Sequence, residues 1–379
     1  MGKIVRRLLE IPLRPGRSAF LWGPRKVGKT YWIRERFAQV GDWVIDLLRT
    51  DEFAEYAARP ALLRERWKGG RVIIDEVQKV PALLDEVHWL IENRRASFLL
   101  TGSSARKLRR GHANLLAGRA WRYEMGPLSC LEIEDFELER AMQAGLLPPH
   151  YLSEQPEMDL RAYVADYLKE EIAAEAATQN IPAFAEFLRV AALTNAELLN
   201  YTNVARESGV SAKVVRGYFQ ILEDTLLGHR LPAWRGKSKR RLIGTQKFYL
   251  FDVGVANALA RRTPVPGNPD FGKSFEHWVW MELTNYRRYR MPDLPIAYWR
   301  TSTGLEVDFI LGEMRTAVEI KASTRLHEGD LRGLRALAEE ERVRHLVVVS
   351  LEAMPRRIGK IEVLPWRTFV EGLYAGEWT

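Results

Sequence analysis

The sequence contains a single cysteine, Cys130, among its 379 residues. One cysteine excludes an intrachain disulfide and excludes a metal site built from several cysteines. Because disulfide frameworks are typical of secreted chains, the expected setting is a reducing cytoplasm.

Long apolar runs are also missing. No stretch approaches the roughly 20 apolar residues that a membrane-spanning helix needs. The first residues, MGKIVRRLLEIPLRPGR, are basic, but they have no continuous apolar segment and no small-residue cleavage site, so no secretory signal is expected. The composition, 46% hydrophobic and 28% charged, is ordinary for a globular chain, and the length suffices for two or three domains. We therefore expect no membrane partner.

Acidic residues are outnumbered by basic ones. The net charge is +8 and the sequence pI is about 9.5. Such a balance favours an anionic partner, most simply nucleic acid, although many basic proteins bind none. The 12 tryptophans can fill a core or stack on bases, and their number does not choose between the two.

The stretch SAFLWGPRKVGKTYWIRERF predicts a nucleotide site. An apolar strand, Ala19 to Trp22, is followed by a loop and then by a helix that opens at Lys29. The loop fits G-x-x-x-x-G-K-[ST], in which glycines let backbone N–H groups surround phosphate oxygens at a helix N-terminus. Lys29 is expected to reach the β- and γ-phosphates and Thr30 to offer its hydroxyl to Mg²⁺. The predicted nucleotide contacts are Gly23, Pro24, Arg25, Lys26, Val27, Gly28, Lys29 and Thr30.

A second apolar strand, in RVIIDEVQKVP, ends in two adjacent acids. Acids at the carboxyl end of a buried parallel strand lie where open α/β sheets bind ligands. Asp75 would hold Mg²⁺, through water, and Glu76 would polarise the attacking water. The alternative is that the pair simply caps a helix.

A third strand, SFLLTGSS, ends in small hydroxylated residues. Ser103 is the candidate for sensing the γ-phosphate, with Ser104 second, and a turn or helix cap is the alternative. Arg119 precedes a further predicted strand, WRYEM, and would neutralise the transition state in cis or in trans; Arg106 is a weaker candidate. Solvated arginines are commoner than either role.

These elements carry a resemblance. GPRKVGKT between a strand and a helix, VIIDE, LLTGSS and LLAGRAWRYEMGPLSCLEI resemble the AAA-type P-loop ATPases of bacteria and archaea that carry a C-terminal region of uncertain function. The resemblance implies a five-stranded parallel sheet with helices on both faces. It says less about what the hydrolysis drives.

The middle of the chain predicts a connector and a helix–turn–helix. Pro148-Pro149 and a change of composition place a boundary near residues 145–158. A short helix, Asn203 to Ser208, a glycine turn and a helix capped by Ser211 are followed by two strands with RGKSKRRLIGTQK between them. This layout favours a winged helix with a basic wing; a small packing or protein-contact domain is the alternative. The predicted DNA contacts are Lys213, Arg216, Gln220, Lys237, Lys239, Arg240 and Arg241.

The last third predicts a cluster of charges on strands. A helix, Gly272 to Tyr286, precedes TGLEVDFIL and AVEIKAS, and HLVVVS reads as a buried parallel strand. Because strand side chains alternate, Glu319 and Lys321 share one face. If Asp308 adjoins them, two carboxylates and a lysine converge, which suits Mg²⁺ and attack of water on a phosphodiester.

The order helix–strand–strand and the E-x-K spacing resemble the restriction-endonuclease-like nucleases, the PD-(D/E)xK superfamily. Asp308, Glu319 and Lys321 match its core positions, and Glu276 matches the acid that many members carry on the preceding helix. Valine stands where the proline of the superfamily name would precede Asp308. A non-cleaving, ion-paired scaffold is the alternative.

The expected fold class is α/β: a P-loop NTPase domain over residues 1–150, a connector and winged-helix-like domain over 151–255, and a restriction-endonuclease-like domain over 256–379. The expected function is an ATP-hydrolysing, DNA-binding protein that couples nucleotide state to DNA processing, with metal-dependent cleavage left open. The expected cofactors are ATP and Mg²⁺, with Mn²⁺ as an option at the nuclease-like site. Single-stranded or branched DNA and a homo-oligomer are compatible with this reading. Two rivals remain: a DNA translocase or branch-migration motor that does not cut, and a regulatory ATPase switch that binds a protein.

Overall fold

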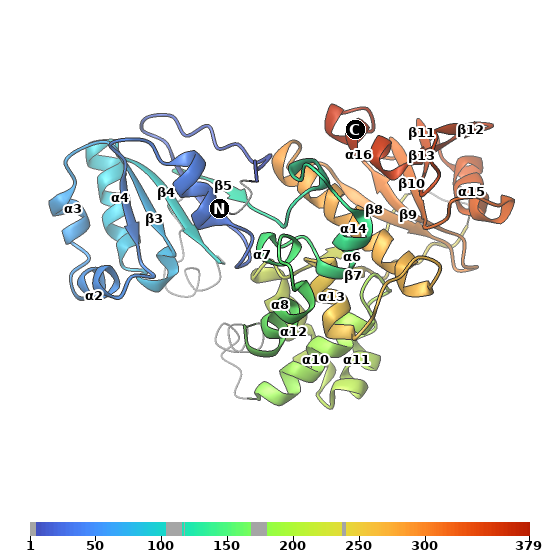
Figure 1. Cartoon of the computed structure of the whole chain (residues 1–379), viewed down its shortest axis with the longest axis horizontal. Helices are drawn as coiled ribbons and strands as arrows, with labels where there is room; N and C mark the ends of the chain where they lie inside the picture. The colour runs from blue at the N-terminus through green and yellow to red at the C-terminus, as the bar shows by residue number, and fades with distance from the viewer. Residues whose placement is uncertain (1–4, 104–115, 117, 168–179, 237–239) are drawn as a thin grey trace.

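Three modules, each with its own sheet, follow one another along the chain (Figure 1). The computed structural model describes residues 5–103, 116, 118–167, 180–236 and 240–379. Four predicted site residues therefore lie outside the described part, namely Ser104, Arg106, Lys237 and Lys239. Within those ranges, no helix is both long enough and apolar enough to cross a bilayer.

A five-stranded sheet in the order β2-β3-β4-β1-β5 forms the N-terminal module. Every neighbouring pair is parallel, which confirms the five-stranded parallel sheet that the resemblance implied. The strands are β1 (Ser18–Trp22), β2 (Trp43–Asp46), β3 (Arg71–Asp75), β4 (Ser97–Gly102) and β5 (Ala120–Glu124). The helices are α1 (Lys29–Trp32), η1 (Ile33–Phe37), α2 (Thr50–Ala58), α3 (Leu62–Arg66), η2 (Val77–Lys79) and α4 (Leu83–Arg94).

Alternation along the central strands divides the core of this module between two faces of the sheet. Phe20 and Leu100 lie in one cluster with Leu83 and Val87 of α4. Their strand neighbours, including Leu21, lie in a second cluster that also takes in α1, η1 and helices of the middle module. The sheet is therefore covered on both faces, as its nearly continuous apolar strands require.

The middle module is mainly helical. Its elements are η3 (Cys130–Glu132), α6 (Leu138–Ala144), α7 (Pro148–Tyr151), α8 (Pro156–Ala162), η4 (Tyr163–Tyr167), α10 (Ile181–Leu193), α11 (Tyr201–Ser208), α12 (Ala212–Asp224), β6 (Gly228–Leu231), β7 (Lys247–Leu250) and α13 (Val253–Ala260). Gly209 ends α11 in the left-handed region, at φ 65°, and the Ser211 side chain caps α12. The short helix, glycine turn and longer helix expected here are present, followed by the antiparallel pair β6 and β7.

The C-terminal module contains a mixed six-stranded sheet in the order β12-β13-β11-β10-β9-β8. Strands β8, β9 and β10 are antiparallel, whereas β11 runs parallel to both β10 and β13, as expected for HLVVVS. The elements are α14 (Pro269–Tyr289), β8 (Ile296–Arg300), β9 (Glu306–Leu311), β10 (Thr316–Lys321), η5 (Glu328–Leu331), α15 (Arg332–Glu340), β11 (His345–Ser350), β12 (Arg356–Ile358), β13 (Ile361–Pro365) and α16 (Trp366–Ala375).

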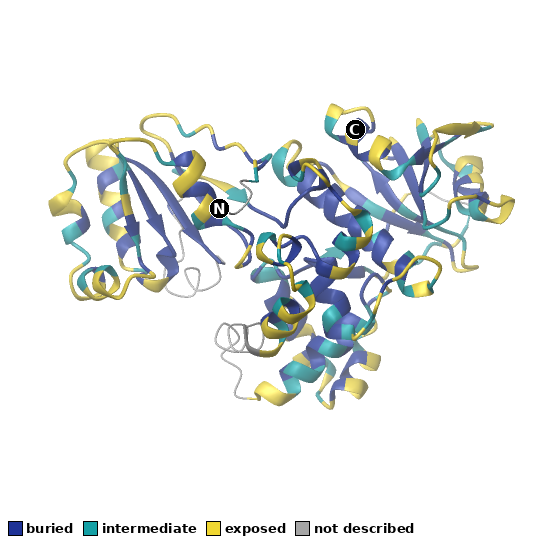
Figure 2. Cartoon of the chain, in the orientation of Figure 1, coloured by how far each residue is buried: buried dark blue, intermediate teal, exposed yellow. Residues whose placement is uncertain are grey.

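Helix α14 is longer and more buried than an amphipathic surface helix. The sequence predicted a helix over Gly272 to Tyr286, but the helix spans 21 residues and most of its middle is buried (Figure 2). Its aromatic residues pack with the C-terminal sheet, while Glu282 bonds to Ser129 in the segment that leaves the N-terminal module. A polar residue of this helix, Glu282, therefore lies at the contact between the N-terminal and C-terminal modules.

The segment between β6 and β7 lies along the edge strand β8. Trp234 N–H donates to the carbonyl of Tyr298 at 2.7 Å, and Ile243 N–H donates to the carbonyl of Arg300 at 2.9 Å. An uncovered edge strand would offer unpaired backbone groups to other chains. The ends of the predicted wing thus protect this edge and hold the middle module to the C-terminal one.

Candidate functional site

The loop after β1 has the backbone of a phosphate cradle. Lys26 and Gly28 both adopt positive φ, at 64° and 94°. Gly23 must be glycine because a Cβ there would lie 2.4 Å from the carbonyl oxygen of Met125. Helix α1 then begins at Lys29, as predicted, so the loop leads directly into a helix N-terminus.

Lys29 is held inside this loop. It is 5% exposed, and its ammonium donates to the carbonyl of Gly23 at 2.6 Å and to that of Pro24 at 3.1 Å. These loop carbonyls hold the charge at the place where the sequence predicts the phosphates. The residues present therefore fit a nucleoside triphosphate.

Thr30 and Asp75 lie side by side at the carboxyl ends of the parallel strands. The Thr30 hydroxyl donates to Asp75 Oδ2 at 2.6 Å, and the Thr101 hydroxyl on β4 donates to the other oxygen, Oδ1. Asp75 is 2% exposed. A hydroxyl and a carboxylate oxygen are hard ligands that suit Mg²⁺, whose remaining positions are usually filled by phosphates and water. The predicted pair thus fits such an ion, and Thr101 is a partner that the sequence reasoning missed.

Glu76 is linked to Ser103 through a residue that was not predicted. Gln78 Nε2 donates to Glu76 Oε2 and lies 3.3 Å from Ser103 Oγ. Glu76 itself has φ 60°, a left-handed backbone that costs a non-glycine residue energy and that is often retained at functional sites. Gly102 leaves room for this link, since a Cβ there would lie 2.2 Å from Gln78 Oε1. The glutamine after D-E-V was the available signal, but no general rule assigns it a role.

Arg119 is not at the nucleotide site of its own chain. Its guanidinium pairs with Glu92 at the end of α4. It precedes β5, and β5 runs parallel to β1 with Ala120 opposite Ser18. The start of β5 therefore lies at the opposite edge of the sheet from the phosphate loop, which follows the end of β1. The cis role predicted for Arg119 is wrong for this reason; the role in trans stays a prediction.

The exposed face of α12 carries the predicted DNA contacts of the middle module. Lys213, Arg216 and Gln220 are all exposed. The Arg216 guanidinium lies 5.1 Å from the centre of the Tyr201 ring, which orients it, and Gln220 bonds to Asp224. These side chains form one polar face of a helix whose other face is buried.

The basic segment of the predicted wing is partly engaged within the chain. Arg240 donates to Glu340 Oε1 at 2.6 Å and to Glu339 Oε2 at 2.9 Å, both on α15. Arg241 is exposed, and its carbonyl accepts from Ser302 N–H at 2.8 Å. Arg240 is thus already paired with two carboxylates, whereas the sequence predicted it as a DNA contact.

The C-terminal strands bring the predicted charges together. Lys321 donates to Glu319 Oε1 at 2.5 Å, which confirms that the two side chains share a face, and Asp308 Oδ2 accepts the backbone N–H of Ile320 at 2.8 Å. Burial, reinforced by Glu319, raises the pKa of Asp308 well above its usual value. Burial also raises the pKa of Glu319 to about 7, against the opposing effect of Lys321.

Glu276 joins this cluster together with a residue that the sequence did not indicate. Lys247, the first residue of β7, lies 3.3 Å from Glu276 Oε1 and 2.6 Å from Glu306 Oε1. Burial disfavours the charged form of Lys247, but Glu276, Asp308 and Glu306 more than offset it, so the pKa of this lysine is raised. Tyr249 also donates to Glu276, at 2.5 Å.

The cluster does not fit a divalent metal as it is arranged. One oxygen of each predicted ligand, Glu276, Asp308 and Glu319, has a donor from the protein, whereas Glu319 Oε2 is buried without a hydrogen-bond partner. Across the described ranges, no group of three or more His, Cys, Asp or Glu side chains is placed to hold a metal ion. The predicted metal site at these residues is therefore not supported by the geometry of the carboxylates, and no catalytic step is derived through it.

Comparison with protein families identifies the first module. Residues 16–134 match the model of an AAA domain. This module is an AAA-type P-loop domain. Residues 135–265 and 271–369 match two domains of unknown function, DUF8612 and DUF4143. The matched ranges therefore divide the chain after residue 134 and between residues 265 and 271, whereas the sequence predicted divisions after residues 150 and 255.

Curated protein sequences give no match to the chain. Among solved structures, the Aeropyrum pernix ORC1 protein in complex with DNA is 11% identical, with 65% of this chain and 86% of that chain covered at a TM-score of 0.29. The A. pernix ORC2 protein in its ADP form is 14% identical, with 65% and 88% covered at a TM-score of 0.30. The whole chains superpose poorly, so no property of these proteins is transferred to this one.

The phosphate loop of the AAA domain touches the middle module. Lys26 Nζ lies 3.5 Å from His150 Nε2 and 5.0 Å from the centre of the Tyr163 ring. Pro148 lies against Gly28, at 3.7 Å from the position of its missing Cβ. Burial, with a contribution from Lys26, lowers the pKa of His150 to about 4. A neutral imidazole therefore faces Lys26, and helix α7 contacts the nucleotide loop directly.

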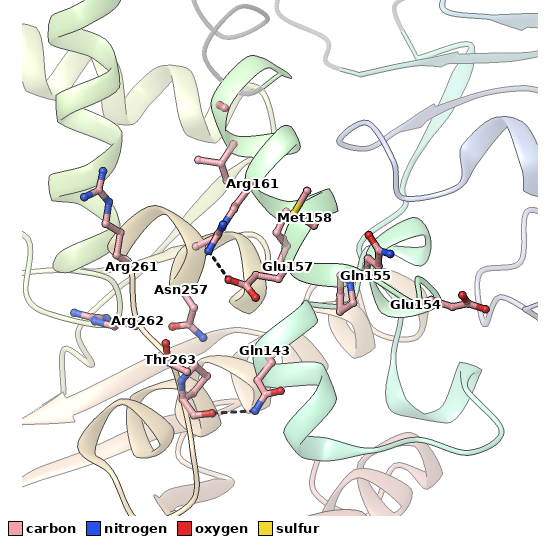
Figure 3. Close-up of a pocket in the computed structure, with 16 residues that line it drawn as sticks. Gln143, Glu154, Gln155, Glu157, Met158, Arg161, Asn257, Arg261, Arg262 and Thr263 are labelled. Atoms are coloured by element: carbon pink, nitrogen blue, oxygen red, sulfur yellow. Dashed lines mark hydrogen bonds and ion pairs between the residues drawn. The ribbon is translucent and has the colours of Figure 1, made fainter.

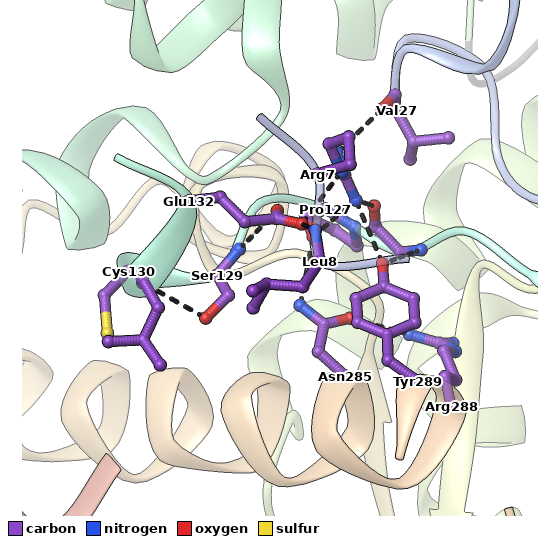
Figure 4. A network of polar contacts seen from close by, with 12 residues as sticks. Arg7, Leu8, Val27, Pro127, Ser129, Cys130, Glu132, Asn285, Arg288 and Tyr289 are labelled. Carbon is purple, nitrogen blue, oxygen red and sulfur yellow. Dashed lines mark hydrogen bonds and ion pairs between the residues drawn. The ribbon is translucent and has the colours of Figure 1, made fainter. Parts of the chain in front are cut away.

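A buried polar network joins the AAA domain to α14 (Figure 4). Arg7 donates to the carbonyl of Val27 in the phosphate loop at 3.0 Å and to the hydroxyl of Tyr289 on α14 at 2.9 Å. Its Nε lies 3.1 Å from Glu132 Oε1. One guanidinium thus contacts the nucleotide loop, the segment that leaves the AAA domain, and the C-terminal module.

A hollow of about 1030 Å³ lies in the middle module, between α8 and the end of α13 (Figure 3). Several of its polar groups already bond to one another or to nearby backbone: Arg161 pairs with Glu157, and Gln143 donates to the carbonyl of Pro264. None of the predicted nucleotide, DNA or carboxylate-cluster residues lines it. We assign it no ligand.

Proposed function

We propose that this protein hydrolyses ATP in its AAA domain and that the nucleotide state acts on DNA bound by the middle module. The observation that carries the hydrolysis is the convergence of buried Lys29 with the Thr30–Asp75 pair, 2.6 Å apart, at one edge of a parallel sheet. This is where phosphate-binding loops and metal-holding acids meet in nucleotide hydrolases.

The roles of the chain's own groups follow from their places. Backbone N–H groups of residues 23–30 and the Lys29 ammonium would bind the phosphates. Thr30 and Asp75 would hold Mg²⁺, which when bound neutralises charge on the phosphates. Glu76 would orient the attacking water and accept its proton, and Gln78 would fix the position of that carboxylate.

The proposal that DNA is the partner rests on the exposed face of α12. Lys213, Arg216 and Gln220 project from a helix that follows a glycine turn and a shorter helix, the arrangement in which a helix enters a DNA groove. The net charge of +8 favours the same class of partner. Exposed Arg241 would add a phosphate contact, whereas Arg240 would first have to leave its two carboxylates.

Two direct contacts offer routes by which nucleotide state would reach the other modules. Lys26 contacts His150 of the middle module, and Arg7 links the carbonyl of Val27 to Tyr289 of α14. A nucleotide that reorders the loop would have to alter both contacts. Contact alone is not coupling, so the coupling has to be measured as a change of DNA affinity with nucleotide.

The experiment compares the wild type with Lys29→Ala and Glu76→Gln. We expect Lys29→Ala to lose ATP binding, and Glu76→Gln to retain binding while hydrolysis falls on the order of 100-fold or more. ATP turnover and the fluorescence of a labelled nucleotide give the two quantities. Equal turnover in the wild type and Glu76→Gln would contradict the assignment of Glu76.

The same proteins decide between the rivals when single-stranded, linear and branched DNA are added. A DNA affinity that differs between the ATP and ADP states supports the proposed coupling. Strand displacement or branch migration without cutting supports the motor. If DNA changes neither ATP turnover nor any binding signal, the regulatory switch with a protein partner is favoured.

Metal-dependent DNA cleavage is the second candidate function. One observation favours it: α14, β8, β9, β10, α15 and β11 follow in the order of a restriction-endonuclease-like core, with Asp308, Glu319 and Lys321 together on the strands. The pairing of its carboxylates opposes it. Cleavage of DNA with Mg²⁺ or Mn²⁺ that disappears in Asp308→Ala alone would establish it.

A further inference from the structure

Lys247 is the cation that lies nearest to two of the C-terminal carboxylates, although it belongs to another module. Its ammonium lies 2.6 Å from Glu306 Oε1 and 3.3 Å from Glu276 Oε1, and only 5% of its side chain is exposed. The ring of Tyr298 lies below it, with its centre 5.4 Å away, a further favourable contact for a cation. Lys247 is therefore enclosed by groups that all favour positive charge.

The backbone fixes Lys247 in this position. It opens β7 and pairs with Leu231 of β6 on one side. On the other side it forms a bridge with Leu198, and the carbonyl of Gln246 accepts from Leu199 N–H at 2.8 Å. The ammonium thus enters the cluster from a strand that is hydrogen-bonded on both edges, and it is not carried on a free loop.

The two carboxylates beside Lys247, Glu276 and Glu306, have other donors as well, whereas Glu319 Oε2 is buried without a hydrogen-bond partner. Besides Lys247, Tyr249 donates to Glu276 at 2.5 Å and Arg300 donates to Glu306 at 2.8 Å. A divalent ion would need several of these carboxylate oxygens to turn towards one point. It would also lie within a few ångströms of the Lys247 ammonium, where like charges repel strongly in a buried setting.

We propose that Lys247 takes the place of a divalent metal beside Glu276, so that the carboxylate cluster is an ion-paired joint between the middle and C-terminal modules. While β7 remains in its place, the cluster does not bind a divalent ion. This inference goes beyond the proposed function and is independent of it, because it concerns neither ATP turnover nor the α12 surface.

The first test is Mn²⁺ binding to the full-length, nucleotide-free protein, followed by the electron paramagnetic resonance signal of free Mn²⁺. The wild type and Asp308→Asn are compared, so that any ion held at the AAA domain cancels. We expect identical titrations. One tightly bound Mn²⁺ that the wild type holds and Asp308→Asn loses would overturn the proposal.

The second test removes the internal cation. Lys247→Met leaves Glu306 and Glu276 less well paired and can weaken the fold, so Lys247→Met/Glu306→Gln is made beside it, and circular dichroism identifies the folded variants. We expect the folded variants to bind one Mn²⁺ at least about tenfold more tightly than the wild type. Adding Glu276→Gln should remove the gain.

Two control outcomes complete the second test. Glu306→Gln alone retains Lys247 and should therefore gain no Mn²⁺ affinity. A folded Lys247→Met/Glu306→Gln protein that binds Mn²⁺ no better than the wild type would overturn the proposal. If both lysine variants unfold, the wild-type and Asp308→Asn titration decides.

Discussion

The guanidinium of Arg7 lies 3.0 Å from the carbonyl oxygen of Val27, a residue of the phosphate loop 20 positions later in the chain. The same guanidinium donates to the Tyr289 hydroxyl of α14. Both contacts come from the two terminal nitrogens of one planar guanidinium. Arg7 therefore forms one hydrogen bond to the phosphate loop and another to the C-terminal module.

Replacing Arg7 should destabilise the whole chain. Arg7→Met leaves Glu132, whose side chain is fully buried, without its cation, and removing one member of a buried pair typically costs about 3–5 kcal/mol. We expect a lower midpoint of thermal unfolding, measured by circular dichroism, and weaker ATP binding because the loop loses a support. Arg6→Met is the matched control, since Arg6 is exposed.

The double variant Arg7→Met/Glu132→Gln distinguishes the cause. If the uncompensated carboxylate is responsible, the double variant should be more stable than Arg7→Met alone. If Arg7→Met and Arg6→Met had the same midpoint of thermal unfolding, the network would contribute nothing measurable to stability.

Gln78 should affect the rate of hydrolysis and not the binding of ATP. Gln78→Leu keeps the side chain's size but removes the amide that holds Glu76 and reaches Ser103. Because a misplaced base is a poor base, kcat is expected to fall on the order of 10–100-fold with KM little changed. The adjacent exposed Lys79, changed to alanine, is the control. A rise in KM at unchanged kcat would mean that Gln78 serves the loop and not the base.

The α12 surface is tested by charge reversal and salt. Lys213→Glu and Arg216→Glu should each weaken binding to any DNA sequence, and the slope of log K against log salt should fall by about one for each lost phosphate contact. Arg94→Glu makes the same change of charge on the AAA domain, at an exposed helix end. Equal effects from all three variants would mean that only net charge matters, and no effect would remove α12 from the proposal.

The buried carboxyl group of Glu282 should make the stability of the folded protein depend on pH. Burial raises its pKa from 4.5 to about 7, although Ser129 and the Cys130 backbone donate to it. The folded state therefore keeps a proton that the unfolded state releases above pH 4.5, so this stabilisation is complete below that pH and is lost as the pH rises towards 7. The loss is on the order of 3 kcal/mol.

Glu282→Gln stays neutral and can still bond to both partners. Its melting temperature relative to the wild type should therefore rise between pH 5 and pH 8. Glu154→Gln, at an exposed position, should show no such trend. A flat difference for Glu282→Gln would mean that the carboxyl group ionises normally in the folded protein.

Much of the candidate nucleotide site could be predicted from the sequence because its parts are local. Gly23 to Thr30 form one continuous segment, a loop that leads into α1, and Asp75 and Glu76 lie at the end of β3. Parallel strands bring their carboxyl ends to the same edge, so the strand pattern alone predicts that these residues meet. Thr101 and Gln78 were not predicted, because a threonine within a strand and a glutamine in a loop or turn have many structural uses.

Arg119 shows where local reading fails. An arginine just before a strand is typical of several roles, and only the parallel pairing of β5 with β1 shows that the start of this strand lies far from the phosphate loop. Arg240 is a similar case: the sequence predicted it as a DNA contact in a basic wing, whereas two glutamates of α15, about a hundred positions later, pair with it.

The sequence by itself predicted the phosphate loop, the helix–turn–helix elements and the E-x-K strand, because each depends on contacts between near neighbours or on the period of a strand or helix. The five-stranded parallel sheet was implied by the family resemblance, and it joins strands that are far apart in the sequence. The tertiary structure decided which charges are free to act. Lys247, Arg7 and Glu282 meet their partners across modules, and the free energy of a buried charge depends on those partners far more than on its own type. For that reason the sequence predicted a metal site at carboxylates that, in the folded chain, lie in ion pairs with Lys247 and Lys321.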